Sequence, residues 1–529
     1  MAKIDDLLTK AFSCWENGNI QDARNFFLKA LKFKPNNPDL LSYVGILDVQ
    51  LGNFESGINY FKKANIFLPH NKDITLNYSN ALINYANYEI NNKNFTSAIS
   101  HLEESIKILP ENEIAYLNLF KLYIQEKKYL QFEERFVEAL KVNSKNANFY
   151  FLHGNCLFDQ KKYDAALEAF KLASRLNADF FESIFHEALC HEFLGNIDSA
   201  LNKYESCLNL KPNYELALFN KGQFLLSMDN YAEGWPLYRY RWTTKKNIGE
   251  YLFDPNSELS DLVSSKHRVL VWGEQGIGDQ IIFASMLNDF KKIFPNLTVM
   301  LDKRLIPIFK RSFADINFLD FSQRYSCEFD FHIPLGNIGI FVRKKIEDFK
   351  KQKKSFLISE KNLNKEIYSE IRKNKKLICG ISWTSKNDFY GESKSISLDC
   401  MSSYLKEFDF KFVNLEYVDN HQEVNKAIED HSIDIYNPDQ IDKFNDLESL
   451  AALISNCDLV ITVSNVNAHF AGALGIKTLL ITPFNYGRLW YWSDKNYSKW
   501  YPSVKIFRQK EQNSWKKTLE ELKDHLANS

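Results

Sequence analysis

A glycine-rich turn in the second half of the chain carries the first residues whose types and spacing could do chemistry. A β-rich run, Val269–Trp272, leads into Gly273, Gly276 and Gly278, and a helical stretch begins near Asp279. Glycines at such a turn allow a ligand to approach the backbone at the N-terminus of a helix. No Lys-Ser/Thr pair follows, so this is not a P-loop. The acid could take a proton from an incoming hydroxyl, or it could simply cap the helix, and both interpretations stay open.

A second junction between a strand and a helix collects four polar residues. The run Leu459–Val463 is followed by Ser464, Asn465, Asn467 and His469. Free backbone N–H groups and the helix dipole favour an anion at such a helix start, by ~0.3–1 kcal/mol at exposed sites. A histidine could add a donor to a bound diphosphate. The alternative is that His469 is an ordinary core histidine.

An aromatic cluster lies close to the C-terminal end. Trp490 and Trp492 flank Tyr491, and Arg488 precedes them. Their flat rings could form a wall for a base or a sugar. Aromatic residues at this density serve equally well as packing under a lid, so the two interpretations carry the same weight.

The elements expected to position these residues alternate between β-rich and helical stretches. The β-rich runs are Val269–Trp272, Leu297–Leu301, Leu377–Trp383, Lys411–Leu415, Leu459–Val463 and Thr478–Thr482. Such alternation predicts βαβ units and parallel sheets. A Lys-rich helical stretch, 347–376, divides the region into an N-terminal lobe of residues 266–360 and a C-terminal lobe of residues 361–529. Two facing lobes of this kind usually bind ligands in the cleft between them.

The first half of the chain repeats with a period of 34 residues. Frames begin at 4, 38, 79, 113, 147, 181 and 215, and one insertion of seven residues falls near 73–79. The first frame carries Gly18, Ala23, Phe27, Ala30 and Pro35 at its marker positions. In the fourth frame Phe120 and Phe132 replace small residues, so this repeat is expected to pack differently. Small residues where two helices must approach, with proline after the second helix, predict antiparallel helix pairs.

This repeat pattern resembles the tetratricopeptide repeat (TPR), and it predicts an α-helical superhelical solenoid of about seven repeats over residues 1–244. Residues 245–265 are then a linker. In TPR solenoids the first helix of each repeat lines a concave groove, and position six of the frame is expected to face it. Asn84, Asn118 and Asn220 occupy that position. They are similar to the asparagine ladder with which O-linked N-acetylglucosamine transferases hold an acceptor peptide, because an amide can both donate to and accept from a peptide bond. The alternative is that asparagine is abundant throughout this chain.

The two motifs of the second half, in this order, resemble those of heptosyltransferase-like glycosyltransferases with the GT-B fold. The whole chain resembles bacterial fusions of TPR arrays with such a transferase, in which a final Trp-Tyr-Pro-Ser run also recurs, here at 500–503. The resemblance implies two Rossmann-like lobes. It implies that Asp279 is the general base. The nucleotide-sugar donor and its phosphates would contact Gly276, Gly278, Lys394, Ser464, Asn465, Asn467 and His469. Ser464-Asn465 stands where the family usually has Asp-Thr, which leaves the donor sugar unnamed.

Composition excludes some classes of protein. The chain has 529 residues, and Lys+Arg 66 against Asp+Glu 67 gives a net charge of -1. Without a basic excess, no nucleic-acid partner is expected. The eight cysteines are scattered without metal-site spacing, so reduced thiols are expected and neither a metal nor another cofactor. No signal peptide or apolar run long enough to span a bilayer is found, which predicts a soluble, cytoplasmic protein.

The sequence therefore predicts a metal-independent glycosyltransferase. The enzyme would transfer a sugar from a nucleotide sugar to an acceptor hydroxyl, on a Ser or Thr of a protein or peptide held in the TPR groove. The alternative is a non-catalytic TPR scaffold that binds proteins and carries a degenerate transferase domain.

Overall fold

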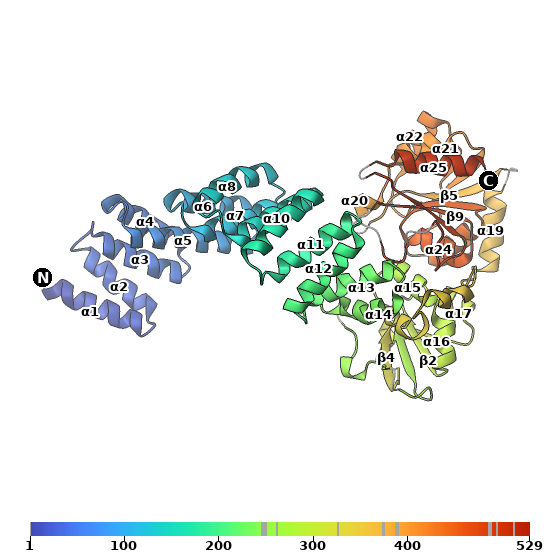
Figure 1. The fold of residues 1–529 in the computed structure, drawn as a ribbon, viewed down its shortest axis with the longest axis horizontal. Coiled ribbons are helices and arrows are strands. Elements are labelled where there is room, and N and C mark those ends of the chain that lie inside the picture. Colours follow the sequence, from blue (N-terminus) through green and yellow to red (C-terminus); the bar gives the residue numbers. More distant parts are fainter. Residues whose placement is uncertain are drawn as a thin grey trace. The chain divides into compact units, whose positions relative to one another are not determined.

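The chain folds into two compact units, residues 1–210 and 211–529 (Figure 1). The computed structural model describes residues 2–244, 251–260, 263–324, 327–372, 376–386, 391–484, 489–492, 496–511 and 514–528. The first unit is helical throughout, and the second combines helices with two parallel β-sheets.

The first unit consists of six antiparallel helix pairs. These are α1 (Ala2–Glu16) with α2 (Ile20–Leu31), α3 (Pro38–Gln50) with α4 (Phe54–Phe67), α5 (Lys72–Asn91) with α6 (Phe95–Ile108), α7 (Glu113–Gln125) with α8 (Tyr129–Val142), α9 (Ala147–Asp159) with α10 (Tyr163–Leu176), and α11 (Phe181–Phe193) with α12 (Ile197–Leu210). The predicted frames at 113, 147 and 181 each begin at the first residue of a helix. The predicted helical repeat array is thus confirmed.

Backbone conformation in the turn within each pair shows the same period. In each of these turns one residue has a positive φ, between 54° and 81°: Gly18, Gly52, Lys93, Lys127, Lys161, Gly195 and Asp229. Successive members lie 34 residues apart, except that Gly52 and Lys93 are separated by 41. The seven extra residues lengthen α5 to 20 residues, whereas α3 and α7 have 13. The insertion therefore adds two helical turns and leaves the repeat intact.

Packing inside the pairs explains the small and large marker residues. A Cβ on Gly154 would lie 2.5 Å from the ring of Phe170, so only glycine allows these helices to approach so closely. In the fourth repeat Phe120 and Phe132 pack against each other instead, with ring centroids 4.6 Å apart, ring planes tilted by 36° and both side chains fully buried. This is the different packing that the sequence predicted for that repeat.

The seventh helix pair belongs to the second unit. It comprises α13 (Glu215–Ser227) and α14 (Tyr231–Tyr238), followed by a short 3-10 helix, η1 (Arg239–Trp242). Trp235 of α14 is buried in the core of that unit. Its indole N–H donates to the carbonyl of Arg343 at 2.9 Å, and its ring packs edge-on against Trp490.

The division between the units therefore differs from the predicted boundary at residue 244. The repeat pattern continues through α14, but the side chains of α14 are buried among residues of the α/β region. Of the predicted linker, 245–250 and 261–262 lie outside the described residues. Within 251–260, Leu259 is buried, and its N–H donates to the carbonyl of His332 at 2.8 Å.

Two parallel sheets form the rest of the second unit. The first has the order β3-β2-β1-β4 and the second the order β10-β9-β8-β5-β6-β7. The strands are β1 (Val269–Trp272), β2 (Leu297–Leu301), β3 (Asn317–Asp320), β4 (Phe331–Pro334), β5 (Leu377–Ser382), β6 (Phe410–Asn414), β7 (Ile435–Tyr436), β8 (Leu459–Val463), β9 (Thr478–Thr482) and β10 (Val504–Arg508). All six predicted runs form strands, whereas β3, β4, β7 and β10 were not predicted.

Helices connect and cover these strands. They are α15 (Ile277–Ala284), α16 (Leu287–Ile293), α17 (Ile306–Ser312), α18 (Gly339–Val342), α19 (Lys361–Ile371), α20 (Gly391–Lys394), α21 (Leu398–Leu405), α22 (His421–His431), α23 (Leu447–Ser455), α24 (Val466–Leu474) and α25 (Lys516–Ala527), with 3-10 turns η2 (Pro255–Ser257), η3 (Phe321–Gln323), η4 (Leu335–Asn337) and η5 (Ile346–Lys351).

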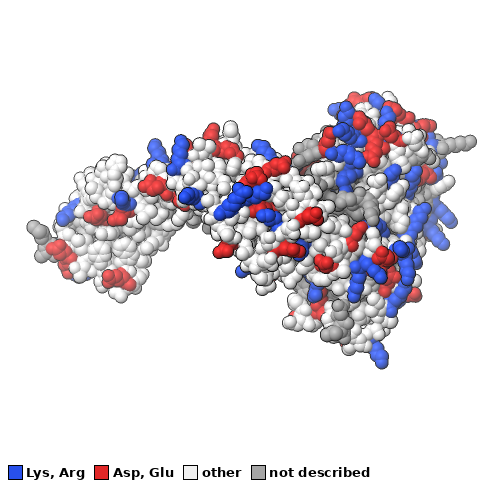
Figure 2. Space-filling view, viewed as in Figure 1, with Lys and Arg blue, Asp and Glu red and all other residues white. Residues whose placement is uncertain are grey.

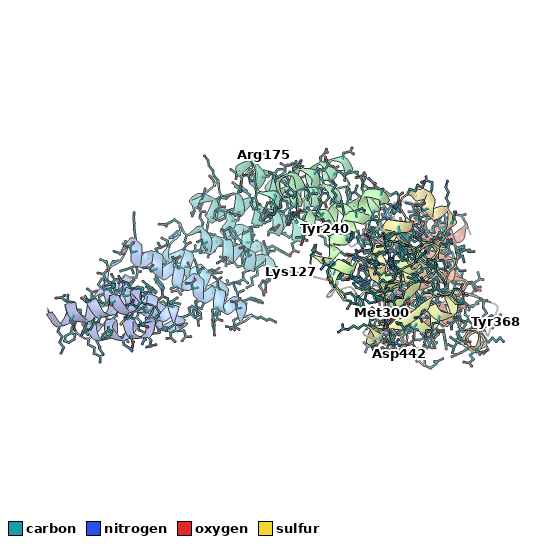
Figure 3. The ribbon with its side chains drawn as sticks, turned by 90° about the horizontal axis from the view of Figure 1, so that it is seen from below. Lys127, Arg175, Tyr240, Met300, Tyr368 and Asp442 are labelled. Atoms are coloured by element: carbon teal, nitrogen blue, oxygen red, sulfur yellow. The ribbon has the colours of Figure 1, made fainter. Side chains whose placement is uncertain are left out.

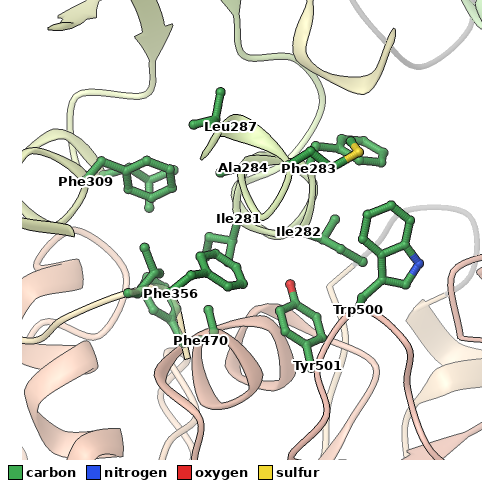
Figure 4. Packing of buried hydrophobic residues seen from close by; sticks show 14 of the residues in the cluster. Ile281, Ile282, Phe283, Ala284, Leu287, Phe309, Phe356, Phe470, Trp500 and Tyr501 are labelled. Atoms are coloured by element: carbon green, nitrogen blue, oxygen red, sulfur yellow. The ribbon is translucent and has the colours of Figure 1, made fainter. Parts of the chain in front are cut away.

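One hydrophobic core joins the two sheets. Helix α15, which follows β1, packs directly on α24, which follows β8. The buried cluster between them contains Ile281 and Ile282 of α15 with Phe470 of α24, Trp500 and Tyr501 (Figure 4). The ring of Phe283 lies edge-on to that of Trp500. The two predicted lobes are thus in direct contact through α15 and α24. Each of these helices has apolar side chains that its own sheet does not cover, and the other helix covers them.

Charge is mixed over the surface. Acidic and basic side chains are interspersed, and Lys and Arg gather along the edge of the second unit near α17 and α19 (Figure 2).

Met300 of β2 lies inside this unit, whereas Tyr368 of α19 is half exposed at its periphery (Figure 3). Within the described residues, every helix is too short or too polar to cross a membrane.

The burial of Trp235 predicts where the second unit can be cut. A fragment that starts at Lys211 should unfold in one cooperative transition. A fragment that starts at residue 246 lacks Trp235, and removing a buried tryptophan alone costs about 3–5 kcal/mol. We expect its midpoint to fall by about 10 °C or more, or the transition to lose cooperativity. Thermal unfolding followed by circular dichroism compares the two, and equal midpoints would contradict the boundary at 210.

Candidate functional site

Both predicted motifs follow strands at which the strand order of a sheet reverses. In the first sheet β1 lies between β2 and β4, and the glycine-rich turn follows β1. In the second sheet β6 and β7 extend the sheet on one side of β5. The chain then returns, and β8 pairs with the other side of β5. Ligands of parallel α/β sheets usually bind at the carboxyl ends of strands at such switch points. The topology therefore places both motifs at positions where ligands usually bind.

Asp279 caps the helix that it begins. It is the third residue of α15, and its Oδ2 accepts from the backbone N–H of Gly276 at 3.3 Å. The other oxygen, Oδ1, lies 3.5 Å from the hydroxyl of Tyr491. The capping role suggested by the sequence is thus present, and one carboxylate oxygen is only weakly bonded. A second role of that oxygen in proton transfer stays a prediction.

A buried ion pair holds the turn before Asp279. The guanidinium of Arg241 in η1 donates to both carboxylate oxygens of Glu274, at 2.8 Å from Nε to Oε2, and both side chains are almost completely buried. Arg241 also donates to Asn337 Oδ1 at 2.6 Å, and Glu274 Oε1 accepts from the N–H of Gly336 at 2.8 Å. Breaking a buried pair of this kind typically costs 3–5 kcal/mol. The glutamate of the glycine-rich turn is therefore an anchor to the last helical repeat.

Asn465 ties two strands together at the second switch point. It is the N-cap of α24, and its Oδ1 accepts from the N–H of Asn467 at 3.0 Å. Its amide N–H₂ donates to Ser382 Oγ at 3.1 Å and to the carbonyl of Thr384 at 3.0 Å. The amide of Asn465 is thus occupied by the protein itself.

Asn467 and Ser464 are buried beside it. The Asn467 amide donates to the carbonyl of Leu415 at 3.1 Å, whereas its Oδ1 is buried without a hydrogen-bond partner among the described residues. Ser464 Oγ accepts from the indole N–H of Trp492 at 2.9 Å. Both predicted contact residues lie at the start of α24, but their side chains face protein.

His469 forms the contact between the two motifs. A Cβ on Gly278 would lie 2.7 Å from His469 Cδ2, so α15 and α24 could not approach this closely with any other residue at 278. The imidazole Nδ1 and the Tyr501 hydroxyl share a hydrogen bond of 3.0 Å. Burial, with the charge of Lys394 nearby, lowers the pKa of His469 to about 3. The ring is therefore neutral near pH 7 and carries no positive charge to a ligand.

Asp279 and Lys394 form the titratable pair of the site. Burial raises the pKa of Asp279 to about 6, against opposing effects from the Gly276 N–H and from Lys394. Lys394, at the end of α20, is almost completely buried, and this burial lowers its pKa to about 8 although Asp279 acts in the opposite direction. A carboxylate that titrates near neutral pH beside a cationic amine is suited to proton transfer and to anion binding.

Lys394 is a buried cation that could contact a phosphate here, together with the N–H groups at the start of α24. The described residues contain no group of three or more His, Cys, Asp or Glu side chains that could hold a metal ion. Residues 387–390, directly before α20, lie outside the described residues.

The aromatic cluster is largely packing. Trp490 is buried against Trp235 and Trp500, and Trp492 packs against His469 with ring centroids 5.1 Å apart and ring planes tilted by 32°. These contacts favour the packing interpretation over a wall for a base or sugar. Arg488 lies outside the described residues.

The three predicted groove asparagines do not all lie in one unit. Asn84 on α5 and Asn118 on α7 are in the first unit, exposed and half-buried respectively, and Asn220 on α13 is in the second. The Asn220 amide donates to the carbonyl of Leu216 at 2.8 Å in its own helix. Other asparagines cap helices, as Asn37 and Asn71 do through their side-chain oxygens. The abundance of asparagine thus has a partly structural origin, and a peptide ladder stays a prediction.

Sequence reasoning missed several residues of the site. Tyr491 reaches Asp279 from between the two tryptophans that had been singled out, and Tyr501 from the Trp-Tyr-Pro-Ser run holds His469. Glu416 accepts from the N–H groups of Trp383 and Thr384, both at 2.6 Å, and shapes the turn after β5. Only the two tyrosines had a signal in the sequence, because they lie inside runs already noted.

Comparison with known proteins supports the repeat assignment. Residues 117–179 match the tetratricopeptide repeat family. The chain is 26% identical over 363 residues to protein FlbA of Caulobacter vibrioides, which covers 64% of this chain and 60% of that protein. The chain thus spans less than two thirds of that relative's length.

Solved TPR structures give partial matches. YrrB, a TPR protein with an unusual peptide-binding site, is 16% identical, covering 37% of this chain and 97% of YrrB with a TM-score of 0.30. A tetratricopeptide repeat protein from Parabacteroides merdae is also 16% identical, covering 47% and 95% with a TM-score of 0.32. The C-terminal part of a TPR protein from Cytophaga hutchinsonii is 11% identical, covering 45% and 95% with a TM-score of 0.36.

The contact between Gly278 and His469 predicts unequal effects at two glycines of one turn. Gly278→Ala should lower the free energy of unfolding by about 1–3 kcal/mol, because its methyl group overlaps the imidazole. Gly276→Ala is the matched control, since the nearest atom to its Cβ is Asp279 Oδ2 at 3.5 Å. We expect it to cost less than ~1 kcal/mol. Urea denaturation measures both, and equal losses would argue against the close approach of α15 and α24.

Proposed function

We propose that the second unit is a glycosyltransferase domain that uses a nucleotide-sugar donor. The observation that carries this proposal is the pair formed by Asp279 and Lys394 at two switch points. One residue follows a strand of the first sheet and the other follows a strand of the second, and burial brings both pKa values towards neutrality. Two packed parallel sheets with reactive groups at these points are what a GT-B transferase requires.

Asp279 is the proton acceptor in this proposal. Its ionised carboxylate takes the proton of the acceptor hydroxyl, and the oxygen attacks the anomeric carbon of the donor sugar. The bond from that carbon to the diphosphate oxygen breaks, and its electron pair leaves with the diphosphate. General-base assistance of this kind is worth typically 10²–10⁴ in rate. A pKa of about 6 leaves most of the carboxylate ionised at pH 7 while keeping it basic enough to accept the proton.

Lys394 compensates the charge that develops on the leaving diphosphate. Its amine is buried, so its interaction with an anion is weakly screened by water. The start of α24 adds backbone N–H groups and the positive end of the helix dipole. Asn465 and His469 act indirectly, by fixing this helix start against β5 and α15.

The helical repeats supply the acceptor in this proposal. The TPR fold of the N-terminal half is suited to binding a protein or peptide partner. We propose that it presents a Ser or Thr hydroxyl of such a partner to the second unit. Neither a metal nor another cofactor enters the proposed reaction.

The second candidate function is a non-catalytic scaffold. The observation that favours it is that the family match lies entirely within the repeats, at residues 117–179. In that case the polar residues at the switch points have structural roles only, as Asn465 and Glu274 visibly do.

Ligand-dependent unfolding of the full chain tests the donor site. A nucleoside diphosphate or nucleotide sugar at a hundred times its Kd should add about 2.7 kcal/mol of stability. Lys394→Met should weaken binding at least tenfold, because it removes the buried cation. Lys406→Met, at an exposed lysine after α21, is the matched control and should leave binding unchanged.

The same test includes turnover. Asp279→Asn keeps an oxygen for the Gly276 N–H but cannot accept the proton, so release of diphosphate from the donor should fall at least a hundredfold with donor binding retained. If no nucleotide stabilises a well-folded chain, the scaffold is the better proposal.

The two shifted pKa values predict a bell-shaped pH profile. The value of kcat/KM should rise with pH up to about 6 as Asp279 ionises, and fall above about 8 as Lys394 loses its proton. Lys394→Arg keeps its charge at all these pH values, so its profile should keep the acid limb and lose the alkaline limb. An alkaline limb that persists in the arginine variant would remove Lys394 from the proposed mechanism.

A further inference from the structure

A cavity lined by charged residues lies in the second unit, at the opposite end of α15 from Asp279. Its volume is about 480 Å³, within the range of small-molecule sites. It is lined by Ser285, which directly follows α15, by residues of α16, by Asp315, and by Arg343, Lys351, Gln352, Lys353 and Phe356. Ser285 is six residues beyond Asp279, or roughly 9 Å along a helix axis at 1.5 Å per residue. The cavity is therefore separate from the candidate site described above.

The charges that line this cavity are predominantly positive. Five basic residues contribute, Lys291, Lys292, Arg343, Lys351 and Lys353, against the two acids Asp289 and Asp315. The lining thus has a formal excess of three positive charges.

One acid is shared between two of these cations. Asp289 accepts from Arg343 Nη1 at 3.0 Å and also pairs with Lys292 at 2.8 Å. Lys351 and Lys353 are exposed at the rim and form no ion pair with the described residues. The acids therefore leave cationic groups uncompensated, which favours an anion in the cavity.

Two buried polar atoms of the lining lack hydrogen-bond partners among the described residues. They are the hydroxyl Oγ of Ser285 and Nε of Arg343, and only 2% of the Arg343 side chain is exposed. Buried donors of this kind are normally satisfied by protein, water or a ligand. Arg343 is held in place by Asp289 and by Gln352, whose Oε1 accepts from Nη2 at 3.1 Å. Its unsatisfied N–H is therefore preorganised.

We propose that this cavity binds the phosphate group of a phosphate-bearing ligand. A phosphate ester carries close to two negative charges and several strong acceptor oxygens. The fixed guanidinium and the serine hydroxyl can each donate to those oxygens, and the rim lysines supply charge. A carboxylate would leave more of the positive charge uncompensated. The phosphate can belong to a soluble ester or to a lipid headgroup, since both present the same chemistry.

Titration calorimetry of the full chain with inorganic phosphate and with pyrophosphate, at constant ionic strength, tests the soluble source. We expect a saturable site whose affinity falls at least tenfold in the double variant Lys351→Glu/Lys353→Glu. The matched control is Lys344→Glu/Lys345→Glu, because these lysines have the same charge and exposure in the same segment but do not line the cavity. Its affinity should change less than threefold. Ser285→Ala should weaken binding about three- to tenfold without altering the surface charge.

Binding to lipid vesicles tests whether the phosphate belongs to a lipid headgroup. Sedimentation with phosphatidylcholine vesicles that contain phosphatidic acid is compared with vesicles that contain phosphatidylserine at equal charge. Recruitment by phosphatidic acid alone, lost in Lys351→Glu/Lys353→Glu and retained in the control, assigns the ligand to a headgroup.

The proposal is overturned if neither phosphate source binds, or if Lys351→Glu/Lys353→Glu binds as the unaltered chain does. Lys394→Met separates this cavity from the proposed donor site. Phosphate or pyrophosphate binding that survives Lys394→Met supports the cavity. Binding that is lost in Lys394→Met but unaffected by Lys351→Glu/Lys353→Glu supports the donor site and refutes this inference.

Discussion

The close packing of α15 on α24 is the constraint on which the rest of the second unit depends. Gly278 has no side chain where His469 lies, and this allows two helices from different sheets to share one core. The contact brings together two motifs that are about 190 residues apart in the chain. The contact also buries His469 so completely that its imidazole stays neutral. His469 therefore contributes to the packing of the two helices as well as donating or accepting a hydrogen bond. Without this approach, Asp279 and Lys394 would not belong to one site.

Burial at this contact explains the electrostatics of the site. Water is excluded from a carboxyl and from an amine at the same place, and each then resists ionisation. Their mutual attraction opposes this effect, and the result is one pKa of about 6 and one of about 8. A group that titrates near neutral pH is more useful for moving protons than one that is always charged. The same burial that holds the two sheets together therefore also prepares the proposed chemistry.

The last helical repeat has a different role from the six before it. Arg241 and Trp235 extend from the end of the repeat array into the α/β core, where they meet Glu274 and Trp490. A repeat whose side chains are buried in this way cannot be removed without leaving a charge and a cavity behind. The turn that carries Asp279 is thus held from one side by Arg241, directly after the last helical repeat, and from the other by α24.

The local patterns of the sequence were sufficient for the repeats and for six of the strands. A 34-residue period and short β-rich runs can be read from residues that are close together in the chain. The positive φ values confirm the period, and β1, β2, β5, β6, β8 and β9 confirm the β-rich runs. Gly276, Gly278, Asp279 and the α24 residues were also correctly placed at helix starts. The pairing of Arg241 with Glu274, the contact of Tyr491 with Asp279 and the unit boundary at 210 were not predictable. They depend on side chains that meet across 33 to 212 positions, and only the tertiary structure decides such contacts, since no local spacing encodes them.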